Sequence, residues 1–216
     1  MKKLLLITTT LFFVFFTKTM VAQPSMGPKL GLGFSKITNI GGDADIKSAA
    51  NTRMHLGVVF NFIGGKVFSF QPEILYMQKG FKMISTEEKN VFYKLNTNYF
   101  EIPAMFKFSF GSEKIKGFFD IGPYFAYWAS AKNKYRDDPD ENVQQEDYTF
   151  DNDDDMRLDV GLGFGGGVSY KLGPGKIVLD LRYDLGFLNI VQDPDDPCAN
   201  RTFGISVMYL FNLKKQ

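Results

Sequence analysis

The amino-acid sequence predicts an all-β fold, an eight-stranded antiparallel transmembrane β-barrel connected as an up-and-down meander. Three observations lead to this prediction. Apolar and polar residues alternate with a period of two in eight separate segments, as expected for strands whose two faces differ. The connections between these segments are alternately short and long. One face is almost wholly large and apolar, whereas the other mixes glycine and serine with charged residues.

The start of the chain predicts export from the cytoplasm. Two lysines near the N-terminus precede the apolar stretch Leu4–Phe16, which is shorter than the roughly 20 residues that a membrane-spanning helix needs. Ala22 is a small residue suited to cleavage by a signal peptidase. We therefore expect a signal peptide over residues 1–22 and a single β-barrel domain over residues 23–216.

The eight expected strands are placed by their alternating side chains. In the second, for example, Leu56, Val58 and Phe60 alternate with smaller or polar residues. The strands are expected at 29–36, 53–62, 68–84, about 91–110, 117–131, 158–170, 179–186 and 201–212. Connections are short at Ile63, Gly111 and Leu172 and longer near Gly41, Ser85, Lys132 and Asn189, the longest being an acidic loop over 132–156. Short turns on one side and long loops on the other are typical of transmembrane barrels.

The charged face decides whether such a barrel lies in water or in lipid. In a soluble barrel the interior is apolar, and burying unpaired ions there would cost several kcal/mol each. In a transmembrane barrel the charged side chains share a polar lumen and the apolar face meets lipid. We therefore predict an ion-pair network in the lumen, formed by Glu73, Glu101, Lys107, Asp120, Arg182 and Asp184. A central cluster of Phe106, Leu181 and Phe203 would contradict this prediction.

Several short motifs occur in a recognisable order along the chain. They are KLGLGFS at 29–35, QPEILY at 71–76, YFEIP at 99–103, GPY at 122–124 and LRYDLG at 181–186. In these motifs the chain resembles the PorT-like outer-membrane β-barrel proteins of Bacteroidetes. The resemblance implies an eight-stranded barrel located in the cell outer membrane. It implies little about activity, because most members of the family have no assigned biochemical role. The family's namesake is linked to protein secretion, and no residue here carries that role over.

An acidic run in the long loop is the candidate metal site. Asp151, Asp153 and Asp155 offer carboxylate oxygens of the kind that calcium prefers. The EF-hand pattern is absent, since Met156 stands at its glycine position and Leu162 at its terminal acidic position. A solvated acidic loop is the default interpretation, so we predict no bound metal and no cofactor.

Catalytic and nucleotide-binding motifs are not convincing in this sequence. Gly161, Gly163 and Gly166 match a dinucleotide-binding fingerprint, but the chain continues as a strand where that site needs a helix. His55 is the only histidine and lacks a nucleophile elbow or metal-ligand spacing, so we interpret it as a lumen residue. We therefore predict no catalytic residue and no enzyme activity. Basic and acidic residues number 25 and 24, which gives no electrostatic case for nucleic acid.

The predicted function is a non-enzymatic structural or interaction role, in which a lipid-embedded barrel presents surface loops. The acidic loop over 132–156 favours this role, since exposed loops commonly carry binding functions. The alternative is a narrow pore, or an accessory subunit of an export or uptake assembly, although eight strands leave an interior that side chains largely fill. Expected partners are outer-membrane lipid and lipopolysaccharide, with outer-membrane or periplasmic proteins as further candidates.

Overall fold

A computed structural model describes residues 24–37, 46–86, 90–150, 156–189 and 199–213. These residues form nine strands: β1 (Ser25–Ile37), β2 (Ile46–Ile63), β3 (Phe68–Ser85), β4 (Phe92–Gly111), β5 (Ile115–Arg136), β6 (Gln144–Asp147), β7 (Leu158–Leu172), β8 (Gly175–Gly186) and β9 (Asn200–Asn212). No helix in the described part of the chain is long and apolar enough to cross a membrane. The predicted signal peptide lies outside these residues.

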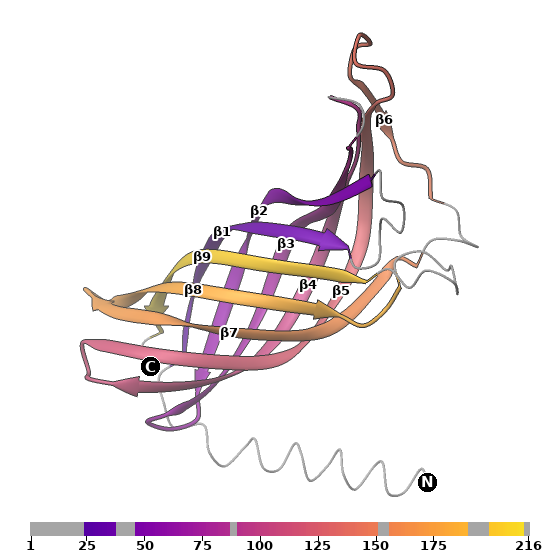
Figure 1. Cartoon of the computed structure of the whole chain (residues 1–216). Helices are drawn as coiled ribbons and strands as arrows, with labels where there is room; N and C mark the ends of the chain where they lie inside the picture. Colours follow the sequence, from indigo (N-terminus) through magenta and orange to yellow (C-terminus); the bar gives the residue numbers. More distant parts are fainter. Residues whose placement is uncertain (1–23, 38–45, 87–89, 151–155, 190–198, 214–216) are drawn as a thin grey trace, which may run out of the picture.

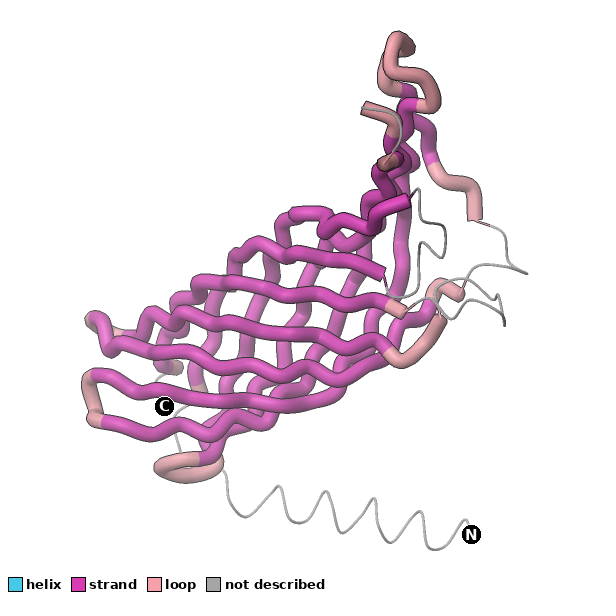
Figure 2. Tube along the Cα trace, in the orientation of Figure 1, coloured by secondary structure: helices cyan, strands magenta, loops and turns pink. Residues whose placement is uncertain are grey.

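Eight of the strands form one closed barrel (Figures 1 and 2). The hydrogen-bonded order is β4-β3-β2-β1-β9-β8-β7-β5, and pairing of β4 with β5 closes the ring. All pairings are antiparallel, and each barrel strand is joined to the next along the chain. The eight-stranded meander predicted from the sequence is confirmed. Closure leaves the barrel without a free sheet edge, so the backbone groups of every strand are paired within the ring.

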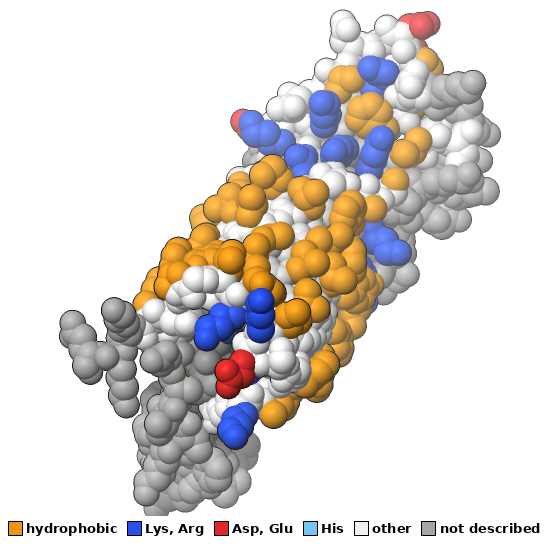
Figure 3. All heavy atoms as spheres, turned by 90° about the vertical axis from the view of Figure 1, so that its left-hand side faces the viewer, with side chains coloured by type: hydrophobic (Ala, Val, Ile, Leu, Met, Phe, Trp, Pro, Cys, Tyr) orange, Lys and Arg blue, Asp and Glu red, His pale blue; other side chains and the backbone are white. Residues whose placement is uncertain are grey.

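The two faces of the barrel have the predicted polarity. Leu181 and Phe203 are 43% and 40% exposed on the outside, whereas Glu101 and Arg182 are 0% and 5% exposed inside. Outward-facing side chains form a broad apolar belt, drawn in orange in Figure 3. An exposed apolar surface of this extent is stable against acyl chains and unfavourable in water.

The strands are longer at one end of the barrel than the sequence predicted. Residues 132–156 were expected to be a loop, but β5 continues to Arg136 and residues 144–147 form β6. This expectation is wrong because the end of β5 has polar side chains on both faces. It therefore lacks the alternation of apolar and polar residues that indicates a strand. The end of β5 pairs with β4 through its backbone, from Ala131 opposite Thr97 to Arg136 opposite Phe92. Backbone pairing of this kind cannot be read from the pattern of apolar residues. Similarly, β2 begins at Ile46 instead of near residue 53.

These longer strands define what we call the extension: residues 78–85 of β3, 92–98 of β4 and 130–136 of β5, together with β6. It rises away from the rest of the barrel in Figure 1. At the opposite end, the strands are joined by short connections at 64–67, 112–114 and 173–174, and we call this the short-turn end. Gly173 has a φ of 58°, the left-handed conformation that a two-residue hairpin turn requires and that glycine adopts without strain.

Candidate functional site

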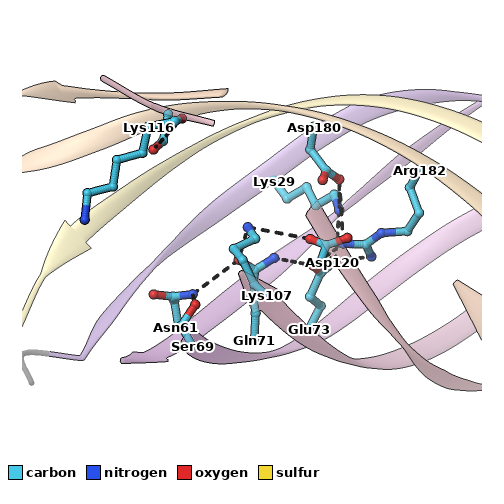
Figure 4. A network of polar contacts seen from close by, with 11 residues as sticks. Lys29, Asn61, Ser69, Gln71, Glu73, Lys107, Lys116, Asp120, Asp180 and Arg182 are labelled. Carbon is cyan, nitrogen blue, oxygen red and sulfur yellow. Dashed lines mark hydrogen bonds and ion pairs between the residues drawn. The ribbon is translucent and has the colours of Figure 1, made fainter. Parts of the chain in front are cut away.

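The lumen contains a dense cluster of charged side chains near its middle, which we call the inner ion cluster (Figure 4). Its members are Lys29, Gln71, Glu73, Lys107, Asp120, Asp180 and Arg182. The Lys29 Nζ donates to Glu73 Oε2 and to Asp180 Oδ2, each at 3.0 Å. Arg182 donates two parallel hydrogen bonds to the Glu73 carboxylate, at 3.0 and 2.8 Å. This bidentate geometry is the strongest form of such a pair.

Gln71 connects this cluster to a second basic side chain. Its Nε2 donates to Glu73 Oε1 at 2.7 Å, and its Oε1 accepts from Lys107 Nζ at 2.6 Å. The Lys107 Nζ also lies 3.7 Å from Asp120 Oδ2 and 3.8 Å from the centre of the Phe118 ring. The inner ion cluster therefore links residues of β1, β3, β4, β5 and β8 across the lumen.

A second group of polar contacts, the outer ion cluster, lies closer to the extension. It consists of Lys79, Glu101, Tyr124, Asp159 and Asn200. The Lys79 Nζ lies 2.7 Å from Glu101 Oε2 and donates to Asp159 Oδ2 at 3.2 Å. Asp159 also accepts from Tyr124 Oη at 3.3 Å and from Asn200 Nδ2 at 2.9 Å. The structure thus separates Glu101 from Glu73 and Arg182, with which the sequence had grouped it.

The predicted set of lumen residues differs from these contacts in two ways: one predicted residue makes no ion pair, and two paired residues were not predicted. Asp184 is buried in the lumen, but it lies beyond ion-pair distance of every basic side chain that the structure describes. Lys29 and Lys79 were not predicted, although each is fully buried and pairs with two carboxylates. Lys29 could have been found from the sequence, because it alternates with outward-facing Pro28 and Leu30.

Aromatic side chains close the lumen above the outer ion cluster. We call Tyr99, Trp128, Tyr148 and Phe150 the aromatic cap. The Trp128 side chain is 1% exposed, and its ring lies 6.1 Å from Tyr99, 5.5 Å from Tyr148 and 5.0 Å from Phe150. At the short-turn side of the inner ion cluster, an apolar layer of Val59, Phe118, Val178, Met208 and Leu210 is also buried. Side chains therefore fill the lumen from the aromatic cap to this apolar layer, as expected for eight strands.

His55 lies on the lumen face. Its Nε2 is 2.7 Å from Ser206 Oγ, and both side chains belong to residues that are 3% exposed. A serine and a histidine at this distance resemble a nucleophile and its base, but no described carboxylate orients the other ring nitrogen, and burial keeps substrate away. The pair is therefore part of the lumen packing.

The candidate calcium ligands Asp151, Asp153 and Asp155 lie outside the described residues. Within the residues that are described, no three His, Cys, Asp or Glu side chains are placed to hold a metal ion together.

On the outward face of the extension, the side chains change from apolar to polar and then to basic with increasing distance from the apolar belt. The belt ends at neighbouring residues Tyr76, Phe100 and Tyr127 of β3, β4 and β5. The next set of paired positions is polar and consists of Gln78, Asn98 and Ser130. Further out, Lys82 lies opposite Lys94, which in turn lies opposite Lys134, and we call these three the lysine row. Figure 3 shows basic side chains gathered above the apolar belt.

A closed antiparallel barrel with an apolar exterior and a lumen of paired charges is a membrane-spanning β-barrel. The sequence shows the family of this barrel. The family model described as outer membrane protein beta-barrel domain matches residues 21–192. The chain belongs to this family, and it is therefore located in the outer membrane. In barrels of this type, short turns face the periplasm and longer connections face the cell exterior. No curated protein matches the chain in sequence.

Several solved outer-membrane barrels are similar in fold. The attachment invasion locus protein Ail of Yersinia pestis is 13% identical, with coverage of 88% of this chain and 100% of that chain and a TM-score of 0.46. The outer membrane protein OprG of Pseudomonas aeruginosa is 10% identical, with coverage of 88% and 94% and a TM-score of 0.47. Neisserial surface protein A is 13% identical, with coverage of 89% and 100% and a TM-score of 0.43.

Proposed function

We propose that this protein is a non-enzymatic outer-membrane barrel whose extension is an interaction surface, and that the lysine row binds the phosphate groups of outer-leaflet lipopolysaccharide. The single observation that supports this most strongly is the row itself. Three lysines stand directly opposite one another on adjacent strands, further out along the extension than the lipid-facing belt. None of Lys82, Lys94 and Lys134 is within ion-pair distance of a carboxylate in the described residues.

The arrangement of the row is unfavourable in the protein alone. Like charges directly opposite one another on neighbouring strands destabilise a sheet. Burial, together with the positive charges of Arg53, Lys82 and Lys134, lowers the pKa of the Lys94 ammonium below its ordinary value. A row of uncompensated ammonium groups gains stability when an anionic ligand supplies the missing negative charge.

The height of the row supports a lipid-linked anion. Lys94 is six residues beyond Phe100, which places its backbone about 20 Å further along β4 than the edge of the apolar belt. Because barrel strands are tilted, the height above the belt is smaller, and the lysine side chains span part of it. In this proposal, the phosphate groups of the outer-leaflet glycolipid lie in this zone, above the apolar belt.

The filled lumen supports a role without transport. The aromatic cap and both ion clusters lie across the axis, whereas a pore needs a continuous path for water. The alternative, a narrow pore or an accessory subunit of an export or uptake assembly, would show itself as stable single-channel steps in a planar bilayer or as a co-purifying outer-membrane partner. A PorT-like affiliation remains part of this proposal and rests on the short motifs such as QPEILY at 71–76.

The test measures binding of the refolded barrel to lipopolysaccharide in detergent. The triple variant Lys82→Gln, Lys94→Gln, Lys134→Gln is expected to lose at least about ten-fold in affinity, since each charged contact contributes roughly 1.5 kcal/mol. The matched control removes three lysines at the periplasmic end, as Lys116→Gln, Lys171→Gln and Lys176→Gln, and should bind as the wild type does. The wild type and the two triple variants should bind dephosphorylated lipopolysaccharide with equally low affinity. Equal affinity of the two triple variants would overturn the proposal.

A further inference from the structure

The periplasmic end of the barrel contains a hollow of about 230 Å³ with an unusual lining. Five lysines surround it, and Glu113 is the one acidic side chain among its described lining residues. The lysines are Lys66, Lys114, Lys116, Lys171 and Lys176. They come from three different turns and the adjoining strand ends. The fold therefore brings these positive charges together from separate segments of the sequence.

Two of these lysines point into the barrel. Along β5, Lys116 has the same inward parity as Phe118, and along β8, Lys176 has the same inward parity as Val178; both of those apolar residues are buried in the lumen. Figure 4 shows Lys116 on the periplasmic side of the inner ion cluster. Lys114 is different, because its Nζ lies 5.6 Å from the centre of the outward-facing Tyr170 ring.

The lysines of the hollow have no ionic partners. Unlike Lys29, Lys79, Lys107 and Arg182 deeper in the lumen, they lie beyond ion-pair distance of every carboxylate in the described residues. The hollow is thus a positively charged chamber that opens to the periplasm and is closed at its inner end.

Part of the remaining polar lining is suited to the same kind of ligand. Hydroxyl and amide side chains of Asn61, Ser69, Ser109, Ser169 and Asn212 also line the hollow. Asn61 already donates to Ser69 and Gln71, and Ser169 donates to the Lys116 carbonyl, which leaves Ser69, Ser109 and Asn212 as donors for a ligand. Ammonium groups donate only, so the ligand must supply acceptors and negative charge. A phosphate offers several acceptor oxygens around a compact, multiply charged centre, and lysine binds it as a point charge. A neutral sugar or an apolar molecule would leave the lysines unpaired.

We propose that this periplasmic hollow binds a phosphate-class oxyanion, either free in the periplasm or carried as the headgroup of an inner-leaflet phospholipid. The site lies at the opposite end of the barrel from the lysine row. It is independent of the proposed binding of lipopolysaccharide, and either proposal can fail alone.

The experiment titrates inorganic pyrophosphate into the refolded, full-length mature barrel in a non-ionic detergent at about 0.15 M salt, a concentration that screens long-range attraction. Calorimetry should show saturable binding at one site per barrel. The double variant Lys116→Gln, Lys176→Gln should lose at least about ten-fold in affinity. The control Lys36→Gln, Lys132→Gln changes the net charge equally at the other end, outside the lysine row, and should stay within about two-fold of wild type. Heat-modifiable gel mobility confirms that each variant is folded.

A second arm distinguishes the two sources of phosphate. The same titration is made in nanodiscs of phosphatidylcholine with and without phosphatidylglycerol. Weaker apparent pyrophosphate binding in the presence of phosphatidylglycerol assigns the site to the lipid headgroup, and unchanged binding assigns it to a free anion. Absence of saturable binding in detergent, or an equal loss in both double variants, would overturn the proposal.

Discussion

The basic side chains inside the lumen and those at the two ends of the barrel follow opposite rules. Inside, Lys29, Lys79, Lys107 and Arg182 each lie within 4 Å of a carboxylate from another strand. At the ends, the lysine row and the lysines of the periplasmic hollow have no such partner among the described residues. The same strands, β3, β4 and β8, contribute to both groups.

The difference follows from access to water. A charge in the filled lumen has lost its hydration, and only a partner of opposite charge with good hydrogen bonds offsets that loss. A charge at a rim keeps more of its hydration than one in the lumen, so the fold tolerates it without a carboxylate partner even where neighbouring like charges destabilise it. The paired charges are therefore part of the architecture, whereas the unpaired ones remain available for ligands. Four substitutions probe the packed lumen and the rims, beginning with the largest expected effect.

Removal of the Arg182 guanidinium should have the largest effect. Arg182→Met leaves Glu73 and Asp180 buried with one cation fewer, and breaking a buried pair in this way costs about 3–5 kcal/mol. The free energy of unfolding of the barrel, measured by urea titration in lipid vesicles, should fall by that amount. The control Lys116→Met removes a rim charge and should change it by less than about 0.5 kcal/mol. Equal losses would show that burial does not separate the two groups.

Truncation of the aromatic cap should have a somewhat smaller effect. Trp128→Ala removes a ring that is 1% exposed and leaves a cavity among Tyr99, Tyr148 and Phe150, at a cost of about 3 kcal/mol. The two ion clusters still lie across the lumen below this cavity, so planar-bilayer recordings of the variant should show no stable conductance. Steady single-channel steps from Trp128→Ala would mean that the cap alone seals the barrel, and would favour the pore alternative.

The sequence predicted the barrel well because the fold depends on a repeated, local signal. Alternation in segments such as 201–212 sets which side chains face lipid, and the glycine-rich turn at 172–175 sets where a hairpin ends. The signal disappears at the end of β5, where polar side chains occupy both faces of the strand from Lys132 to Arg136. The end of β5 and the whole of β6 were therefore missed, since only their backbone pairing defines them.

The lumen contacts were harder to predict than the faces. Parity along each strand predicts that Glu101 and Arg182 point inward, but it does not give their height along the axis. That height depends on strand tilt and register, which placed Glu101 beside Lys79 and left Asp184 unpaired. The lysine row could not be predicted from the sequence either, because Lys82, Lys94 and Lys134 come together only through the register of three strands.

Addition of a single methyl group inside the lumen should have a moderate effect. A Cβ at Gly165 would overlap the Asp120 carboxylate and come 3.2 Å from the Leu181 carbonyl oxygen. Gly165→Ala should therefore lower the free energy of unfolding by about 2 kcal/mol, within the usual range for overpacking. Gly65 lies in a short turn where an added Cβ meets no atom within 4 Å, so Gly65→Ala is the matched control. The contrast fails if both variants unfold at the same urea concentration.

The smallest effect should be a gain in stability at the centre of the lysine row. Lys94→Glu replaces two like-charge contacts, with Lys82 and Lys134, by two attractive ones. Cross-strand pairs of this kind contribute a few tenths of a kcal/mol each, so the free energy of unfolding should rise by about 0.5 kcal/mol in detergent without lipopolysaccharide. The same variant should bind lipopolysaccharide less tightly, because the row loses one positive charge and gains a negative one.

The pH dependence of this gain separates electrostatics from packing. Because the folded state lowers the pKa of Lys94, the protonated side chain destabilises the wild-type barrel below that pKa. This penalty is relieved as the pH rises through the lowered folded-state pKa towards the ordinary value of 10.5, since the unfolded chain then binds more protons. The advantage of Lys94→Glu should therefore shrink at high pH. An advantage that stays constant up to about pH 11, beyond the ordinary lysine pKa, would mean that the row is not electrostatically strained, and its proposed need for an anionic ligand would lose its physical basis.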